Sequence, residues 1–188
     1  MKVGILALQG DFEAHAAVLS RLGVEWAYVK RPADLATVDA LIIPGGESTT
    51  FLKFLERDGF FDELRRLGRE KPVFGTCAGA ILLAKEVTNP PQPSLGLIDI
   101  TVERNAYGRQ VESAVRRGRS LLNGGEMEMV FIRAPVIRRV GAGVRVLAEC
   151  DALPVAVEQG NILVATFHPE LTSDTTFHEH FLKLVPAK

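Results

Sequence analysis

Short apolar runs alternate with amphipathic segments through the first half of the chain. Apolar runs of this kind are typical of strands that are covered on both faces, and they predict strands at residues 3–8, 25–29, 39–43 and 72–75. Between them, apolar residues recur at helical spacing, which predicts helices at about 12–22, from 49 to a break at Gly59, at 62–69, and from the segment after 75 through Lys85. Strands that alternate with helices in this way build a parallel sheet with helices on both faces.

The second half of the chain has a different pattern. Prolines mark residues 89–93 as a surface loop, because proline removes backbone donors. Short β-type runs follow at 97–103, 130–132, 144–148, 154–158 and 162–167. We expect an exposed loop at 116–126 and a last helix at about 175–184. The fold class is therefore α/β, with some antiparallel strands in the second half.

Composition limits the function classes that remain. The chain has 188 residues, 47% apolar and 24% charged, which is the mixture of an ordinary globular domain. Its 22 basic and 23 acidic side chains nearly cancel, so the sequence predicts no general attraction to nucleic acid or to an anionic membrane. No apolar run approaches the roughly 20 residues of a spanning helix. We expect a soluble, cytoplasmic protein of one domain.

The most specific local feature is Gly75-Thr76-Cys77-Ala78-Gly79, placed between an expected strand and an expected helix. This G-x-C-x-G pattern is related to the nucleophile elbow, in which a sharp turn presents a reactive side chain. The glycines let neighbouring backbone pass closely, the following helix dipole favours a thiolate, and the Ala78 N–H is a candidate oxyanion donor. An isolated cysteine is more often a small buried apolar residue, and Cys150 keeps that interpretation.

A candidate base lies far along the chain from Cys77. His168 follows an apolar strand and precedes Pro169, which favours an extended conformation. In extended chain, residues two apart project to one side, so His168 and Glu170 can form an imidazole–carboxylate pair. Alone, His-x-Glu could equally be a metal pair or a surface turn. With the elbow, it completes a possible Cys–His–Glu triad.

The remaining histidines do not suggest a second centre. His178 and His180 lie two apart on an expected helix and point to different faces, so we expect both to be solvated. His15 borders an apolar stripe and is expected to be structural. No Cys/His cluster has zinc-site spacing, and no phosphate-binding glycine motif follows a strand. We therefore expect neither a metal nor a cofactor.

Pro44-Gly45-Gly46-Glu47-Ser48 follows an expected strand, at the edge where open α/β sheets place their ligands. The glycines allow close backbone approach, so the N–H of Gly46 could complete an oxyanion hole opposite Ala78. Paired glycines also mark ordinary tight turns, and that alternative stays open here. We expect Ser48 to cap the helix that follows.

These segments give the chain a resemblance. It resembles the class I (triad) glutamine amidotransferases, and among them the glutaminase subunits of ribose 5-phosphate-dependent pyridoxal 5′-phosphate synthases. The matching segments are GILALQGD (4–11), PGGESTT (44–50), FGTCAGA (74–80), VERNAYGRQV (102–111), FIRAP (131–135) and FHPELT (167–172). The resemblance implies one flavodoxin-like, three-layer domain over residues 1–188, with a mostly parallel central sheet. The chain departs from the family mainly at 89–93 and 112–129.

The resemblance also implies roles. Cys77 would attack the side-chain amide of L-glutamine, His168 would act as base and then acid, and Glu170 would orient it. The implied glutamine site consists of Gly46, Glu47, Ser48, Arg104, Ile132 and Arg133. Gly46 and Ala78 would form the oxyanion hole, and Gln9 would shape or activate the site. The implied partner is a (β/α)₈-barrel synthase subunit that receives the ammonia, with no nucleic acid or membrane involved.

Two other functions remain open at this point. The chain could be a cysteine hydrolase or glyoxalase-like enzyme of the related fold, using Cys77 on other carbonyls. It could also be a non-catalytic flavodoxin-like binding module in which Cys77 is inert. The Glu170 partner and the glycine loop favour the glutaminase.

Overall fold

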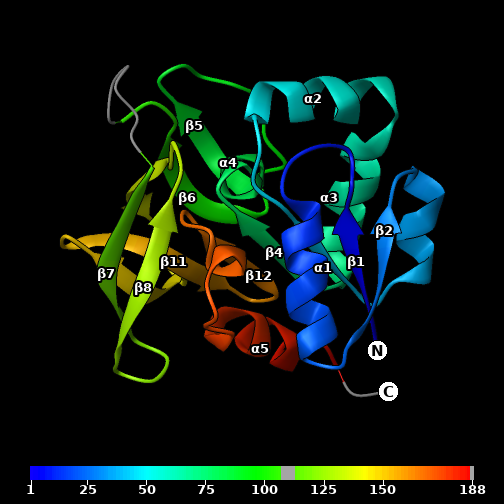
Figure 1. The fold of residues 1–188 in the computed structure, drawn as a ribbon. Helices are drawn as coiled ribbons and strands as arrows, with labels where there is room; N and C mark the ends of the chain where they lie inside the picture. Colours follow the sequence, from blue (N-terminus) through cyan, green and yellow to red (C-terminus); the bar gives the residue numbers. More distant parts are fainter. Residues whose placement is uncertain (107–112, 187–188) are drawn as a thin grey trace.

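The computed structural model describes residues 1–106 and 113–186 (Figure 1). Of the VERNAYGRQV motif, residues 107–111 lie outside the described residues, as does residue 112 of the divergent segment that follows it. Within the described part, helices flank a large twisted sheet (Figure 1).

The large sheet has nine strands among the described residues, in the order β2-β1-β3-β4-β12-β11-β10-β7-β8. Its parallel part consists of β1 (Lys2–Leu6), β2 (Glu25–Val29), β3 (Ala40–Ile43), β4 (Val73–Thr76) and β12 (Ile162–Ala165). Its antiparallel part consists of β7 (Ala114–Ser120), β8 (Glu126–Phe131), β10 (Arg145–Cys150) and β11 (Leu153–Gln159). The order of the parallel strands is the flavodoxin-like one, so the predicted α/β fold class is confirmed.

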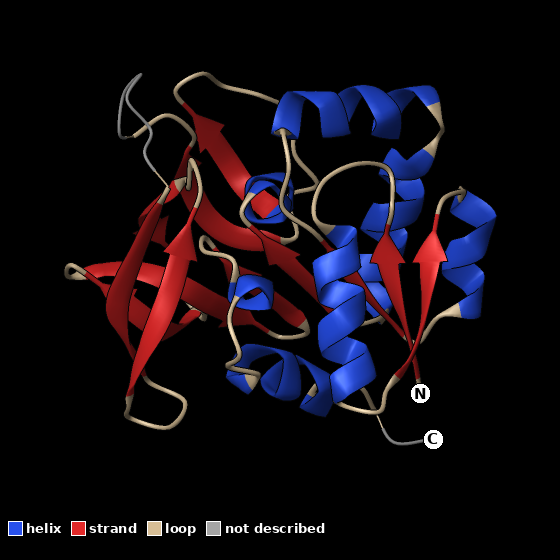
Figure 2. Ribbon diagram, viewed as in Figure 1, coloured by secondary structure: helices blue, strands red, loops and turns tan. Residues whose placement is uncertain are grey.

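Helices cover both faces of the parallel part, as Figure 2 shows. The helices are α1 (Phe12–Arg21), α2 (Ser48–Arg57), α3 (Phe60–Glu70), α4 (Ala78–Leu83) and α5 (Thr176–Lys183), with short 3₁₀ turns η1 (Pro32–Thr37) and η2 (Pro169–Leu171). Helices α1 and α5 pack into one apolar cluster, and α2, α3 and α4 pack into the other. The molecule therefore has three layers.

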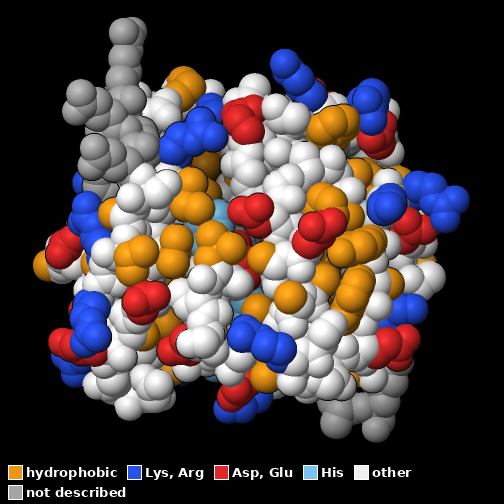
Figure 3. Space-filling model, viewed as in Figure 1, with side chains coloured by type: hydrophobic (Ala, Val, Ile, Leu, Met, Phe, Trp, Pro, Cys, Tyr) orange, Lys and Arg blue, Asp and Glu red, His pale blue; other side chains and the backbone are white. Residues whose placement is uncertain are grey.

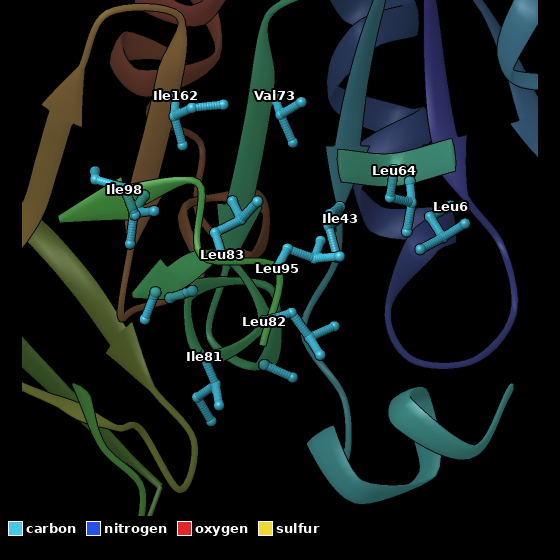
Figure 4. Close-up of a cluster of buried hydrophobic side chains, with 14 of the residues drawn as sticks. Leu6, Ile43, Leu64, Val73, Ile81, Leu82, Leu83, Leu95, Ile98 and Ile162 are labelled. Carbon is cyan, nitrogen blue, oxygen red and sulfur yellow. The ribbon is translucent and has the colours of Figure 1, made fainter. Parts of the chain in front are cut away.

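Side chains alternate between these two clusters along each central strand. In β3, Leu41 and Ile43 enter the cluster with α2 and α3, whereas Ile42 enters the cluster with α1 and α5. Successive side chains of a strand point to opposite faces, and here both faces are buried. Figure 4 shows the cluster that contains α2, α3 and α4, in which Ile43 lies near Leu95 and near Leu82 of α4. This two-sided burial explains the unbroken apolar runs of the sequence.

The structure corrects two expected elements. The helix after the elbow ends at Leu83 instead of Lys85, because Ala84 turns to extended geometry (ψ 150°) and opens β5 (Ala84–Thr88). Segment 116–126 is not one exposed loop, because its two ends lie in the hairpin of β7 and β8. Across that hairpin Arg117 pairs in register with Glu128, so opposite charges stabilise strands that carry a loop-like composition.

A second, smaller sheet was not expected. It consists of β5, β6 (Ile98–Glu103) and β9 (Val136–Val140) in the order β5-β6-β9 among the described residues. Strand β6 was predicted, but β5 and β9 were not. This sheet packs on the cluster that contains α4, through Ile98, Ile100 and Ile137. It lies beside the elbow helix without adding a strand to the main sheet.

Candidate active site

The candidate residues gather at one edge of the parallel sheet. Gln9 follows β1, Gly46 follows β3, Cys77 follows β4 and His168 follows β12. These four strands are neighbours in the order β1-β3-β4-β12 and run parallel, so their carboxyl ends meet at the same edge. In open α/β sheets this edge is where ligands bind. The fold thus brings together residues that are far apart in sequence.

Cys77 occupies a sharp turn between β4 and α4. Its φ of 48° and ψ of −102° are strained for a residue with a side chain, and its N–H donates to the Ala165 carbonyl at 2.9 Å. A Cβ on Gly79 would lie 2.2 Å from the Ile43 carbonyl oxygen, which explains the glycine there. The thiol donates to the Ile132 carbonyl at 3.6 Å. The predicted elbow geometry is therefore present.

His168 and Glu170 form a buried pair. Nδ1 of His168 lies 2.7 Å from Oε1 of Glu170, and the two residues are 3% and 5% exposed. Burial alone would lower the pKa of His168, but its contacts with the Cys77 thiol and with Glu170 outweigh burial and raise that pKa to about 10. Burial would raise the pKa of Glu170, yet the nearby His15 and His168 hold it below its usual range. The pair therefore favours an imidazolium next to a carboxylate.

The second ring nitrogen of His168 is free to act. Nε2 is buried and has no hydrogen-bond partner among the residues that the structure describes. With Nδ1 engaged by Glu170, Nε2 is the ring nitrogen left for proton transfer with a nucleophile or leaving group.

The glycine loop packs directly on this pair. A Cβ at Gly45 would lie 2.3 Å from Cε1 of His168, so only glycine fits beside the ring. At Gly46, φ is +154°, and a Cβ would lie 2.5 Å from Nε2 of Gln9. The Gln9 amide binds the backbone of Glu47, accepting from its N–H at 3.3 Å and donating to its carbonyl at 3.1 Å. Gln9 thus fixes the peptide next to Gly46.

The helix cap after this loop differs from the prediction. Helix α2 begins at Ser48, and Glu47 is its N-cap, accepting from the N–H groups of Thr49 at 2.9 Å and Thr50 at 2.8 Å. The expectation that Ser48 caps the helix was wrong, because the longer Glu47 side chain reaches both donors. Ser48 instead donates from Oγ to Oε1 of Gln92 at 3.1 Å. Burial would raise the pKa of Glu47, but hydrogen bonds from the Thr50 hydroxyl, at 2.7 Å, and from the N–H groups of Thr49 and Thr50 lower that pKa to about 2.

Two arginines were predicted to bind substrate, and the structure places them differently. Nη2 of Arg104 donates to Thr49 Oγ1 at 2.9 Å and lies 3.8 Å from Oε1 of Glu47, so Arg104 joins the α2 cap. Arg133 is exposed, has a φ of +44°, and lines a cavity of about 470 Å³ whose lining contains neither Cys77 nor His168. Binding of glutamine by Arg133 stays a prediction.

Comparison with known proteins places the chain in a family. The model of the SNO glutamine amidotransferase family matches residues 5–186. The chain belongs to the SNO glutamine amidotransferase family. This membership favours the glutaminase over the glyoxalase-like enzyme and the non-catalytic binding module.

Two curated relatives of this SNO glutamine amidotransferase share a name. "Pyridoxal 5′-phosphate synthase subunit PdxT" of Koribacter versatilis is 60% identical over 185 residues, covering 98% of this chain and 96% of the relative. The protein of the same name from Thermus thermophilus is 51% identical and covers 97% and 96%. A solved structure described as a glutamine amidotransferase is 51% identical, with a TM-score of 0.91, and covers 97% and 98%. The similarity therefore spans nearly the whole chain.

The surface of this family member mixes charged and apolar side chains, as its balanced net charge predicts. On the face in Figure 3, acidic, basic and apolar side chains are interspersed. Among the described residues, every helix is too short or too polar to cross a bilayer.

The sequence did not predict the surroundings of two histidines, His178 and His180, of this SNO glutamine amidotransferase. His178 was expected to be solvated, but it is fully buried, whereas His180 is part-buried and lies 2.5 Å from Glu158. His15, expected to be structural, is also fully buried, with Nδ1 3.0 Å from Nε2 of His178. One signal was available: position 178 lies three residues before Phe181, on the apolar side of the helix. The contact between positions 15 and 178 left no local signal.

Proposed function

We propose that this chain is the glutaminase subunit of a pyridoxal 5′-phosphate synthase, and that residues 1–188 act as one catalytic domain. It hydrolyses L-glutamine to L-glutamate and ammonia through a triad of Cys77, His168 and Glu170. The observation that carries the proposal is the strained elbow of Cys77 beside a buried His168–Glu170 pair. Nucleophile, base and orienting carboxylate in this order are the parts of nucleophilic acyl transfer.

The chemistry follows from the two protonation states. The Cys77 thiolate attacks the side-chain amide carbon of glutamine, and the carbonyl oxygen takes the negative charge of the tetrahedral intermediate. Protonated His168 gives its proton to the amide nitrogen, the C–N bond breaks, and ammonia leaves a glutamyl thioester. Neutral His168 then takes a proton from water, hydroxide attacks the thioester, and glutamate departs from the regenerated thiolate. Glu170 stabilises the imidazole in each state in which the ring is charged.

Stabilisation of the oxyanion is assigned to backbone donors. The N–H of Ala78 belongs to the first residue of α4, directly after Cys77, and the N–H of Gly46 lies on the loop after β3. Gln9 holds the Gly46–Glu47 segment by its two hydrogen bonds to Glu47. Removing one donor from such a hole costs on the order of 10²-fold in kcat or more, so the orientation of this segment is expected to set the rate.

Glutamine carries an α-carboxylate and an α-ammonium group, so its site needs both cationic donors and acceptors. Arg104 and Glu47 provide one of each, and they lie 3.8 Å apart beside the loop. Ser48 and the Ile132–Arg133 segment complete the proposed site, in which the Ile132 carbonyl already contacts the Cys77 thiol.

The proposed partner is a synthase subunit. Relatives of 50–60% identity are named as subunits of pyridoxal 5′-phosphate synthase, and ammonia released into water would be protonated and lost. We infer a cytoplasmic hetero-oligomer in which a (β/α)₈-barrel subunit receives the ammonia directly. Docking of the synthase is proposed to complete the oxyanion hole, so the free glutaminase is poorly active.

The test measures glutamate and ammonia release by the wild type, Cys77→Ala and Cys150→Ala, each with and without the synthase subunit. Cys150 is a matched control, because it is also buried and lies outside the site. Loss of turnover in Cys77→Ala alone is expected, together with a sharp rise in wild-type turnover when the synthase is added. Full activity of Cys77→Ala would overturn the triad. An unchanged rate with both proteins folded would overturn the partner assignment.

A second measurement tests the substrate class. An electrophilic glutamine analogue should label Cys77 and not Cys150, and excess L-glutamine should protect it. Failure to label a folded protein that otherwise alkylates at Cys77 would contradict a glutamine site.

A further inference from the structure

A chain of buried polar contacts continues beyond the triad. Behind Glu170, Nε2 of His15 lies 3.5 Å from Oε1 of the carboxylate and 3.1 Å from Oγ1 of Thr76. Nδ1 of His15 lies 3.0 Å from Nε2 of His178. Both histidines are fully buried. These contacts therefore join α5 and α1 to the triad carboxylate and to Thr76, the residue directly before Cys77.

Burial decides the charge of these two imidazoles. Desolvation lowers the pKa of His15, with Glu170 and Asp11 opposing and His168 adding to the decrease. It lowers the pKa of His178 to about 3, with His15 and Arg21 adding and Glu170 opposing. At neutral pH both rings are uncharged, and each carries one N–H.

The hydrogen-bond inventory then selects the tautomers. Nδ1 of His178 is buried and has no partner among the described residues. If Nδ1 of His15 donated to Nε2 of His178, the proton of His178 would sit on its Nδ1 as a buried N–H without an acceptor. Nε2 of His15 would then carry only a lone pair, which would face the Glu170 carboxylate. If Nε2 of His178 donates instead, every N–H has an acceptor, and only a lone pair is left over. Buried orphan donors are rarer and more costly than unused acceptors.

We propose that His15 is a positioning residue for the triad, and that His178 fixes the tautomer in which its Nε2–H points at Thr76 and Glu170. The Nε2–H dipole of His15 then favours the ionised carboxylate. The same N–H also contacts Thr76, the residue directly before Cys77. This donor matters because Glu170 has few others: Oε1 is shared by Nδ1 of His168 and Nε2 of His15, and Oε2 is buried without a hydrogen-bond partner in the described part of the chain. The role assigned to Glu170 rests on the proposed glutaminase function.

The experiment measures the pH dependence of Cys77 alkylation by iodoacetamide, in a Cys150→Ala background, beside glutaminase kinetics with the synthase present. In His15→Phe, Glu170 should take up a proton at higher pH, which moves the acid limb of both profiles up by about one pH unit. We expect kcat to fall about tenfold while KM stays within about twofold. Alkylation does not need glutamine, so it tests the positioning role even if the glutaminase assignment fails.

Variants separate this role from simple packing. His15→Gln keeps an amide N–H at the position of Nε2 and should restore the acid limb, whereas a purely structural role would give no rescue of the pH profile. His178→Phe should shift the limb in the same direction by less, because His178 acts on Glu170 only through His15. A phenyl ring is expected to fit there, since the His178 ring already packs edge-on against Phe74. The matched control is His180→Phe, on the same helix but bound to Glu158, and it should leave both profiles unchanged.

Three results would overturn the proposal. The first is an unmoved acid limb in folded His15→Phe, or in folded His178→Phe if the first variant does not fold. The second is an equal shift in His180→Phe. The third is an acid limb in His15→Gln that stays shifted as in His15→Phe, although His15→Gln has the same unfolding temperature as the wild type.

Discussion

Nδ1 of His168 and Oε1 of Glu170 lie 2.7 Å apart in a region that solvent barely reaches, with His168 at the start of the 3₁₀ turn η2 and Glu170 inside it. The carboxylate fixes which ring nitrogen carries the hydrogen bond, and it leaves Nε2 for proton transfer. Because both groups are buried, neither tolerates the loss of the other: an unpaired buried charge is strongly destabilising. Catalysis and stability are therefore coupled at this pair.

The first prediction concerns Glu170→Gln. The amide keeps the size of the side chain but removes the charge that stabilises the imidazolium, so kcat should fall on the order of 10²-fold or more. Glu158→Gln is the control, because Glu158 also contacts a histidine, His180, outside the site. Steady-state kinetics with the synthase present measures both. Equal losses in the two variants would contradict a specific role for Glu170.

The second prediction is a pH dependence of stability. The folded-state pKa of His168 is raised to about 10 from 6.5, so its contribution to stability is complete below pH 6.5. That contribution declines as the pH rises from 6.5 and is lost above about 10. The free energy of unfolding of the wild type, minus that of His168→Gln, should therefore decrease over this window. A difference that is flat with pH would contradict the imidazolium. Glu170, whose pKa is lowered, contributes in the opposite sense, and its stabilisation is lost at acid pH.

The third prediction concerns Gly45→Ala. The added Cβ would lie 2.3 Å from Cε1 of His168, so the ring must shift. Displacement of a catalytic group by a fraction of an ångström or more costs up to about 10²-fold in rate, and we expect a loss of kcat of roughly tenfold to a hundredfold. Gly125→Ala is the control, since its Cβ would meet nothing closer than 3.5 Å. Unchanged kinetics in a folded Gly45→Ala would show that the loop does not constrain the imidazole.

Much of this site was predictable because its signals are local. The elbow is contained in five consecutive residues, and His168 and Glu170 lie two apart in sequence. The extended backbone expected for that pair was wrong, because Glu170 lies in the 3₁₀ turn η2, which still brings its carboxylate to the ring. The parallel strands were predictable because both of their faces are buried, as the alternation of Leu41, Ile42 and Ile43 shows.

Other features depend on distant partners and leave no local pattern. Strands β7 and β9 carry exposed charged residues, and they become strands through pairing with β8 and β6. The contact between His15 and His178 spans 163 positions. The Glu47 cap was missed for a different reason: short side chains are the common caps, and the reach of a glutamate depends on how the glycine loop presents it.

The fourth prediction separates two roles of Glu47. As N-cap, it accepts from Thr49 and Thr50, and replacing a cap by alanine costs about 1 kcal/mol. Aspartate is a good cap but is shorter, so Glu47→Asp should keep most of the stability that Glu47→Ala loses. If the carboxylate also binds the α-ammonium of glutamine, both variants should raise KM, since neither places a carboxylate at the original position. Chemical denaturation and glutamine titration measure the two effects on the same proteins. A KM that rises only when stability falls would reduce Glu47 to its structural role, because the substrate effect would then follow from fraying of α2 alone.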